Sequence, residues 1–334
     1  MRELKFKKGL YKFYAPWLFK IYKFKAYLYL LLKKEPLTSL PALTQFFWDQ
    51  YLSVKFKQEI LASGEKVYVG ETIYKEHSGR AYILGCGASI NTLSNKEWDV
   101  IGNNLSIGLN NFYIHDFVPN MYFCELIGNA EAKDMIYTYL LNNKAKEEAA
   151  VFLNGRSVFV KGHYEANSSY IKPYFYLTDK IKTNNKTLLV NIIRKYFEGK
   201  IERWRLCHQM SNLDTVINYC VRHNVKEICL VGVDLNDSGY FWDSGDNGAY
   251  ATAVAFRKSI SKQLKYVVTN DGKHATASKE VAKYLGNFTI VEYLKILQSE
   301  ILGPMGVQIY VANPQSLLAE FLPVKAICEF ANVH

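Results

Sequence analysis

The 334-residue sequence lacks several patterns that would assign a protein class directly. Its longest uncharged stretch near the end of the basic N-terminal part is Ala26–Leu32, far shorter than the roughly 20 apolar residues of a membrane-spanning helix. The P-loop lysine motif, the serine-hydrolase elbow and the His/Cys spacings of zinc sites are missing. Internal repeats and low-complexity tracts are missing too, which excludes repeat architectures.

Cysteine chemistry has little place in this chain. The six cysteines show no Cys-x-x-Cys spacing, and three of them lie in apolar runs typical of strands or helices. We therefore expect buried free thiols in a reducing compartment rather than a disulfide framework. The hydrophobic content of 49% is ample for a core, so the chain is predicted to hold one large α/β domain, or one domain with an extension.

The net charge of +10 is concentrated at one end of the chain. Residues 1–34 hold ten lysines and arginines against the single acid Glu3, a balance of +9, which leaves about +1 for the other 300 residues. A nearly neutral body does not favour nucleic-acid binding. The basic end therefore needs its own explanation.

Residues 1–35 interleave lysines with aromatic side chains and predict a basic amphipathic helix, broken or kinked near Pro16. Steps of four and three residues place seven apolar side chains on one stripe: Leu10, Tyr14, Trp17, Ile21, Phe24, Leu28 and Leu31. No charge-free segment leads to a small-residue cleavage site, so a secretory signal is not expected. Two interpretations stay open, a helix lying on an anionic membrane surface or a helix packed on the body.

A second helix is predicted over residues 42–63, after Pro36 and Pro41. Residues 1–63 are therefore expected to form a helical extension, membrane-peripheral or packed on the body. Residues 64–80 are polar connecting sequence.

The apolar run Ala81–Ser89 ends in Gly85-Cys86-Gly87-Ala88-Ser89 and organises the remaining chain. It predicts a buried parallel strand that enters a tight glycine turn, where the backbone can approach a ligand closely. A phosphate or carboxylate suits that place if a helix follows. The turn alone is a weak signal, because Gly-x-Gly after a strand also occurs where a turn merely needs room.

Further strands and helices predict an α/β fold over residues 81–334, with a mostly parallel, Rossmann-like sheet and helices on both faces. Residues 161–210 show little periodicity. The expected strands are Leu105–Asn110, Asn120–Glu125, Ala149–Leu153, Ser157–Val160, Lys226–Asp234 and Gly306–Ala312. The expected helices are Leu93–Ile101, Asn212–His223, Ala249–Leu264 and Ala275–Leu285.

Polar residues at the ends of predicted strands are the first binding candidates. In an open parallel sheet the ligand lies beyond the carboxyl ends of the strands, where Asn110, Glu125 and Asp234 are expected. Asparagine offers a donor and an acceptor to a ribose hydroxyl or a pyrimidine edge. Asn110 and Glu125 can equally be turn formers or helix caps. Asp234 has no Asp-x-Asp partner, which disfavours a metal-dependent sugar-nucleotide site.

The candidate general base is His274. It follows a glycine- and aspartate-bearing segment, about residues 236–275, that predicts a mobile cover over a site. A neutral imidazole there can take a proton from a hydroxyl nucleophile. The alternative is a histidine that only begins a helix. Tyr240 can donate its phenolic hydrogen to a leaving phosphate, although it is one of 25 tyrosines.

Four stretches of the chain resemble the bacterial sialyltransferases of glycosyltransferase family 42, which build host-like termini on lipooligosaccharide. They occur in the family's order over residues 81–321, and the last is the most specific. The stretches are Ile83–Ser89, Leu109-Asn110-Asn111-Phe112, Lys226–Tyr240 and Asn313-Pro314-x-Ser316-Leu317-Leu318-Ala319-x-Phe321.

The resemblance implies one Rossmann-like nucleotide-binding domain with a lid, CMP-sialic acid as donor, inversion at the anomeric carbon and no metal. His274 matches the family's general base, Asn110 a donor-contacting asparagine, and Tyr240 one of two tyrosines that steady the departing phosphate. The residues expected at the nucleotide-sugar site are Gly85, Gly87, Ser89, Asn110, Glu125, Ser211, Asn212, Gly232, Asp234 and Asn236.

The chain departs from the family pattern in the donor pocket. Asn236 stands at the second tyrosine position, Glu125 replaces an asparagine, and Gln209 lies near the place of an arginine, with Ser211 and Asn212 following. The sugar could therefore be another ulosonic acid such as Kdo, and the nucleotide itself could differ. The N-terminal helix has no counterpart in the pattern.

Three hypotheses remain at this point. The first is an inverting, metal-independent transferase of a CMP-activated nonulosonic acid to a glycan or glycolipid acceptor, such as those of lipopolysaccharide or capsule. It would be cytoplasmic and peripheral on the inner face of the cell membrane through residues 1–35. The second is another nucleotide enzyme on the same sheet, such as an ATP- and Mg²⁺-dependent protein like the pterin diphosphokinases. The third is a non-catalytic membrane-peripheral scaffold.

Overall fold

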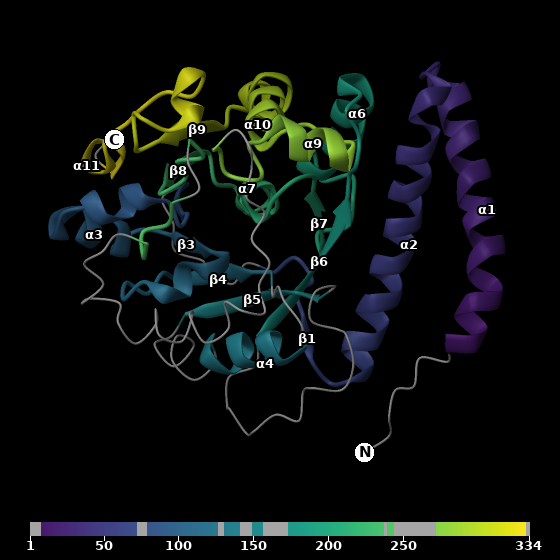
Figure 1. Cartoon of the computed structure of the whole chain (residues 1–334), viewed down its shortest axis with the longest axis horizontal. Coiled ribbons are helices and arrows are strands. Elements are labelled where there is room, and N and C mark those ends of the chain that lie inside the picture. The colour runs from purple at the N-terminus through teal and green to yellow at the C-terminus, as the bar shows by residue number, and fades with distance from the viewer. Residues whose placement is uncertain are drawn as a thin grey trace.

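The computed structural model describes residues 8–71, 79–125, 130–140, 149–155, 173–236, 239–243 and 272–331. Side chains of residues 8–15 and 130–134 are outside the description. Within these ranges, nine parallel strands form one sheet in the order β1-β6-β5-β4-β3-β2-β8-β9, with β7 beside β6 (Figure 1). The strands are β1 (Lys66–Val67), β2 (Arg80–Leu84), β3 (Ser106–Leu109), β4 (Met121–Cys124), β5 (Ala150–Asn154), β6 (Tyr174–Lys180), β7 (Arg205–His208), β8 (Glu227–Val231) and β9 (Gln308–Val311).

The order of the strands reverses between β2 and β8. From β2 the chain runs outward through β3, β4, β5 and β6 to β7, and then returns to place β8 on the other side of β2. Such a reversal leaves a crevice at the carboxyl ends of the two central strands, because their connections leave in opposite directions. The residues after Leu84 and Val231 lie at that crevice.

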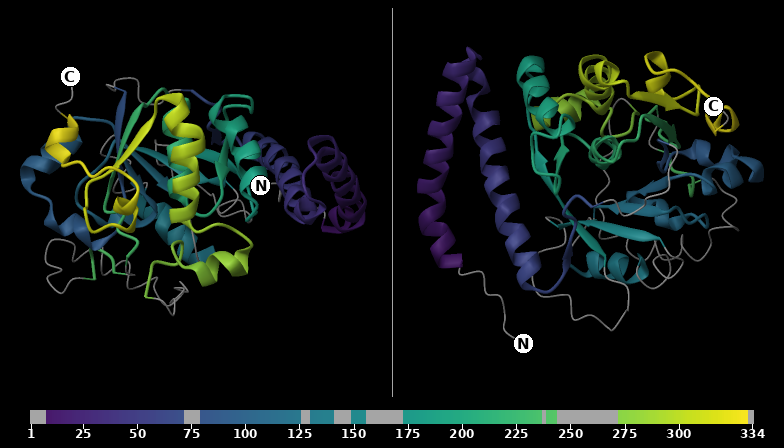
Figure 2. Two further views of the ribbon diagram at one scale, coloured as in Figure 1. Left: turned by 90° about the horizontal axis from the view of Figure 1, so that it is seen from above. Right: turned by 180° about the vertical axis from the view of Figure 1, so that it is seen from behind.

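Helices cover both faces of the sheet (Figure 2). One face packs against α6 (Lys186–Phe197), α7 (Asn212–Arg222) and α10 (Ile290–Leu297), and the other against α3 (Asn95–Gly102), α4 (Ala130–Tyr139) and α11 (Ile327–Ala331). Alternate residues of β2 enter the two cores, and all of Ala81–Leu84 is buried. A strand buried on both sides reads as a continuous apolar run, as this one does. The predicted fold class is confirmed.

The helical extension is a hairpin of α1 (Lys8–Lys33) and α2 (Leu40–Ala62). Its second helix belongs to the main core, where Leu43, Phe46 and Phe47 are buried. Asp179 on β6 is fully buried and ties this helix to the sheet. Its carboxylate accepts a hydrogen bond from Ser53 Oγ at 2.8 Å and pairs with the Arg205 guanidinium at 2.6 Å.

Helix α1 lies outside α2, at the edge of the molecule (Figures 1 and 2). It contacts α2 through the face that carries Tyr22, Ala26 and Tyr29, with the ring of Tyr22 5.9 Å from that of Trp48. The predicted stripe is on the opposite face, where Trp17 is 64% and Phe24 63% exposed. The helix thus packs on the body by one face, as one interpretation expected, and the described residues of the predicted stripe stay exposed on the other.

A break or a kink was predicted near Pro16, and the helix continues through this residue, so it is not broken there. A proline removes one backbone hydrogen bond, and eight helical residues precede it here. Among the described helices, none is both long and apolar enough to cross a membrane.

Several predicted segments differ from the structure. The helix after His274 begins at Lys279 (α9, Lys279–Leu285) and not at Ala275, because Thr276 and Ser278 take part in a turn: the backbone N–H of Ser278 donates to the His274 carbonyl. The aperiodic region 161–210 contains β6, α6 and β7. The predicted strand Ser157–Val160, the helix Ala249–Leu264 and most of the lid lie outside the described residues.

All six cysteines are free thiols, as predicted. Four are buried, and burial raises the pKa of Cys124, Cys207, Cys220 and Cys229. A raised pKa keeps a thiol protonated and unreactive at neutral pH. Cys86 and Cys328 are half-buried.

Candidate functional site

A cavity of about 240 Å³ lies at the carboxyl ends of β2, β3, β4 and β8. Its position is the one expected for the ligand of an open parallel sheet. The residues around it come from the two central strand ends, from the start of α7 and from the segments around Tyr240 and His274. They are Gly85, Cys86, Gly87, Leu109, Asn110, Asn111, Glu125, Met210, Ser211, Asn212, Leu213, Gly232, Val233, Asp234, Leu235, Gly239, Tyr240, His274, Thr276 and Ile290.

The glycine turn after β2 is packed against the turn after β8. The backbone N–H groups of Gly85 and Gly87 donate to Val231 and Gly232 at 2.7 and 2.8 Å. A Cβ at residue 85 would lie closer than 3.0 Å to the Gly232 carbonyl oxygen, and one at residue 87 equally close to the Asp234 carboxylate. These contacts between chain segments are enough to require both glycines, whether or not a ligand also approaches them.

Gly87→Ala is expected to destabilise the protein by about 1–3 kcal/mol, as overpacking of a buried contact usually does. The matched control is Gly102→Ala, where the new Cβ would lie 3.6 Å from the Phe117 ring, an ordinary contact in a helix. That variant should be neutral or slightly stabilising. Urea unfolding of both variants measures the difference, and equal midpoints would contradict the packing explanation.

The Asp234 carboxylate, at the floor of the cavity, connects three segments of the chain by hydrogen bonds. It accepts hydrogen bonds from Ser89 Oγ at 2.6 Å, the Ser89 backbone N–H at 3.0 Å and Asn313 Nδ2 at 2.7 Å. These bonds join the segments that follow β2, β8 and β9. The role they indicate for Asp234 and Ser89 is to shape the site, and Ser89 itself is not among the residues that line the cavity.

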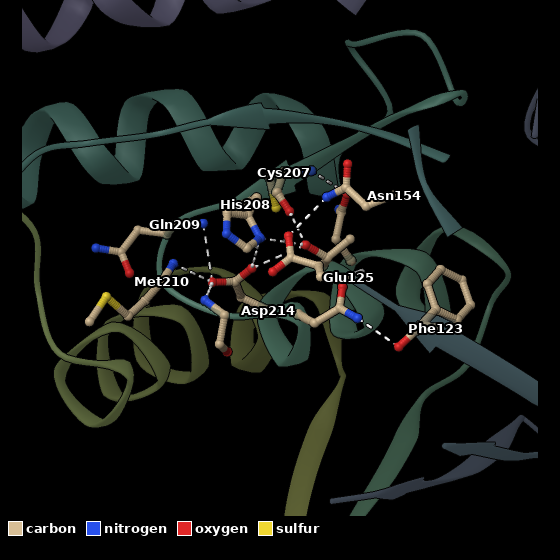
Figure 3. A network of polar contacts seen from close by, with 12 residues as sticks. Phe123, Glu125, Asn154, Cys207, His208, Gln209, Met210 and Asp214 are labelled. Atoms are coloured by element: carbon tan, nitrogen blue, oxygen red, sulfur yellow. Dashed lines mark hydrogen bonds and ion pairs between the residues drawn. The ribbon is translucent and has the colours of Figure 1, made fainter. Parts of the chain in front are cut away.

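Hydrogen-bonded polar side chains form the wall of the cavity near the ends of β3 and β4 (Figure 3). Asn212 Nδ2 donates to Asn110 Oδ1 at 3.1 Å and to the Phe123 carbonyl at 2.7 Å, and its Oδ1 accepts from Tyr176 at 2.7 Å. Asn110 adopts a left-handed backbone, with φ of 49°, which asparagine tolerates. Burial, and next the nearby Glu125 carboxylate, hold the pKa of Tyr176 well above its ordinary value, so Tyr176 remains a neutral donor.

The loop that leads into α7 is wrapped around a buried carboxylate (Figure 3). Asp214 Oδ2 accepts the backbone N–H groups of Gln209, Met210 and Ser211 at 3.1, 2.7 and 3.1 Å. Burial raises the pKa of this carboxyl, against the opposing influence of nearby His208 and of these backbone hydrogen bonds. Because three N–H groups of the loop are already used, they are not available to a ligand.

His274 and Tyr240 face the same cavity. Their rings are perpendicular with centroids 6.3 Å apart, and the Tyr240 ring stacks on Trp242 at 4.5 Å. The Thr276 backbone N–H donates to His274 Nδ1 at 3.4 Å, and Thr276 Oγ1 lies 2.9 Å from the same nitrogen. The first bond favours the tautomer with the proton on Nε2. The other tautomer, in which Nδ1–H donates to Thr276 Oγ1 and the backbone bond is lost, leaves on Nε2 the lone pair that a general base needs.

The structure brings most of the predicted site residues to this one cavity. Ser89 lies beneath it, and Asn236 is exposed, donating from Nδ2 to the Gln315 carbonyl at 3.2 Å outside the lining. The sequence reasoning missed Asn154, Tyr176, Asp214 and Thr276. Only Asp214 had a signal, as the acid of the Ser-x-x-Asp pattern that begins α7.

Within the described part of the chain, no three His, Cys, Asp or Glu side chains are grouped as a metal site would require. Asp234, the acid considered above for such a role, has its carboxylate engaged by Ser89 and Asn313.

No known protein family and no curated protein matches the sequence. Solved structures with a similar arrangement include the Campylobacter jejuni sialyltransferase CstII in complex with cytidine-5'-monophosphate, at 17% identity and a TM-score of 0.42, over 76% of this chain and 88% of that one. Another is the C. jejuni alpha-2,3-sialyltransferase Cst-I, at 15% identity and a TM-score of 0.43, over 79% and 86% of the two chains. At this level of similarity, the residues of this chain decide what its cavity can bind.

Proposed function

We propose that the protein is an inverting glycosyltransferase that transfers a nonulosonic acid, sialic acid or a Kdo-like sugar, from its CMP-activated form to a hydroxyl group of a glycan or glycolipid. One observation carries the proposal: an imidazole and a phenol share a cavity with the polar ends of four strands, at the switch point of a parallel sheet. The four motifs that resemble family 42 sialyltransferases supply the donor class.

In the proposed reaction, His274 Nε2 removes the proton of the acceptor hydroxyl as its oxygen attacks the anomeric carbon of the donor. The bond from that carbon to the phosphate oxygen breaks on the opposite side, which inverts the configuration, and CMP leaves. Tyr240 donates its phenolic hydrogen to the departing phosphate. The proximity of the two rings, at 6.3 Å, supports roles on the two sides of one reacting carbon.

No metal is required by this proposal, because stabilisation of the leaving phosphate is assigned to the phenolic hydrogen of Tyr240. The test is release of CMP from CMP-sialic acid and from CMP-Kdo, with an oligosaccharide acceptor and EDTA present. Turnover with either donor supports the proposal. Turnover that appears only with added Mg²⁺ contradicts its metal-independent form, and no turnover with either donor contradicts its donor class.

Thermal shift separates the proposal from the two other hypotheses. CMP should raise the melting temperature by mass action, since it binds only the folded state. A shift with ATP and Mg²⁺ but not CMP would favour the second hypothesis, and no shift with any nucleotide would favour the scaffold.

Cys86 provides a direct probe of the cavity. Its thiol lines the site and is half-buried, whereas Cys328, also half-buried, lies on α11 outside the lining. Saturating CMP is expected to slow alkylation of Cys86 by N-ethylmaleimide at least several-fold and to leave Cys328 unchanged. Mass spectrometry of the two peptides measures both rates, and equal protection of both thiols would indicate general stabilisation instead of occupancy.

The acceptor is proposed to be a glycolipid at an anionic membrane surface, with the enzyme cytoplasmic and peripheral. Support comes from the basic residues 1–34 and from the apolar stripe that α1 leaves exposed. An enzyme held on the membrane gains effective concentration toward a lipid-linked acceptor.

A further inference from the structure

The hydrogen bonds around Asn110 fix which end of its amide a ligand meets. Oδ1 accepts from the Glu125 backbone N–H at 3.3 Å and from Asn212 Nδ2 at 3.1 Å, so both of its lone pairs are used. Among the described residues, Nδ2 of Asn110 has no hydrogen-bond partner. Asn110 therefore offers two N–H donors at the cavity wall, and the amide cannot turn over without losing both bonds.

Glu125 is held beside it as an acceptor. Its Oε1 accepts from Asn154 Nδ2 at 2.8 Å, while Oε2 has no partner in the described part of the chain. Glu125 lines the same cavity, and no lysine or arginine does so among the described lining residues. Since a carboxylate only accepts hydrogen bonds, this place suits an O–H or N–H group and repels a phosphate or carboxylate.

The position of this pair in the sheet indicates which side of the cavity it occupies. Asn110 and Glu125 follow β3 and β4, whereas Tyr240 pairs with Gly87 in the turn after β2 and the His274 backbone N–H donates to the Leu235 carbonyl after β8. From β4 to β8 there are three strand spacings, roughly 14 Å in all, and from β4 to β2 there are two, roughly 10 Å. Glu125 is thus on the side of the cavity away from His274, and Asn110 is between Glu125 and the glycine turn.

We propose that Asn110 and Glu125 determine donor specificity: together they bind an uncharged, hydrogen-bond-donating group of the donor, an amino or hydroxyl group, on the side of the cavity away from His274, and they exclude an anionic group there. The inference rests on the proposed function, because it takes the ligand to be a nucleotide sugar. The chemistry fits the amino edge of a base or the hydroxyls of a sugar tail, with Asn110 donating to a neighbouring acceptor.

The test is Glu125→Gln, with dissociation constants of CMP, CMP-sialic acid and CMP-Kdo measured by calorimetry. Glutamine keeps an oxygen for Asn154 but removes the charge, so the fold should persist, which a melting curve without ligand checks. Binding should weaken roughly 10-fold or more, as expected on loss of a charge-assisted hydrogen bond. Equal loss for all three ligands assigns the contact to the nucleoside, and loss for the two sugar nucleotides alone assigns it to the sugar.

The control is Glu198→Gln, which removes a carboxylate on the surface after α6, paired there with Lys200. It should leave all three constants unchanged. The inference is overturned if Glu125→Gln binds all ligands within twofold of the wild type, or binds them more tightly because only repulsion was removed. If the wild type binds no cytidylate, the proposed function fails and this assignment with it, so the two failures are distinguishable.

Discussion

Replacing His274 with alanine is expected to lower kcat by about 10²- to 10⁴-fold, the usual contribution of a general base. The acceptor hydroxyl must lose its proton as it attacks, and no other described residue of the cavity lining is a histidine. Binding of CMP should change little, because the imidazole is assigned to the acceptor and not to the nucleotide. Initial rates of CMP release and calorimetric titration with CMP measure the two quantities on the same preparation.

Thr276→Val gives a milder companion to that experiment. Valine has nearly the shape of threonine but removes the hydroxyl oxygen 2.9 Å from Nδ1. Without it the Nδ1–H form loses its acceptor, so kcat should fall about 10-fold and the pH profile should shift, while KM for the donor stays constant. The wild-type rate should fall as the pH is lowered, because an imidazolium cannot accept a proton. A histidine variant that retains full rate would remove His274 from the mechanism.

The main framework of the fold could be predicted from local sequence. Continuous apolar runs that end in glycine or polar residues marked β2 and β8, and the pattern of Asn212–His223 gave α7 to within one residue. These elements are recognisable because their burial is regular along the chain. The glycine after each of these strands indicated a tight turn, and a turn depends only on the residues that form it.

One element was missed although its signal was present. In α6 the apolar pairs Leu188-Leu189, Ile192-Ile193 and Tyr196-Phe197 recur every four residues, and Asn185 caps the helix by accepting from the Leu188 N–H at 3.0 Å. The strand β7 begins with Arg205, and an arginine in the sequence predicts an exposed position, so this strand was not predicted. The ion pair of Arg205 with buried Asp179 compensates for the burial, and that partner comes from a different strand.

The site was predictable in location and not in detail. Placement of polar residues at strand ends follows from the topology of a parallel sheet, so Asn110, Glu125 and Asp234 could be singled out. Which of their atoms remain available to a ligand depends on contacts across the fold. Asp234 is engaged by Ser89, 145 positions away in the chain, and no local pattern predicts such a bond.

In helix α1 the exposed stripe could be predicted from the sequence, but the face that contacts α2 could not. Its stripe was visible as a periodicity, but the face that meets α2 is a second one, composed largely of tyrosine and alanine among lysines. On a helix of about 3.6 residues per turn, the two faces lie roughly opposite each other. Lys20 and Lys23 flank the stripe on one side and Lys25 on the other, all of them exposed.

Replacing Trp17, Phe24 and Leu31 together with serine is expected to lower binding to anionic vesicles about 100-fold. These side chains are 64%, 63% and 51% exposed, and insertion of each between lipid headgroups contributes on the order of 1 kcal/mol. Co-flotation with vesicles of 7:3 phosphatidylcholine and phosphatidylserine measures the loss. Added salt should weaken wild-type binding as well, because the lysines act through screened charge.

A matched triple variant tests whether the loss of vesicle binding is specific to the exposed stripe of α1 or follows from removal of any three exposed apolar side chains. Leu37, Leu61 and Tyr284, 54%, 51% and 89% exposed, lie off α1, and their replacement with serine should leave flotation unchanged. Point variants are sharper than deletion of residues 1–35, because α1 also covers Trp48 and Tyr51 on α2, which a deletion would expose as a new apolar surface. Equal flotation of both triple variants would contradict membrane docking by α1. Loss of self-association instead of flotation, measured by light scattering, would assign the stripe to a second copy of the chain.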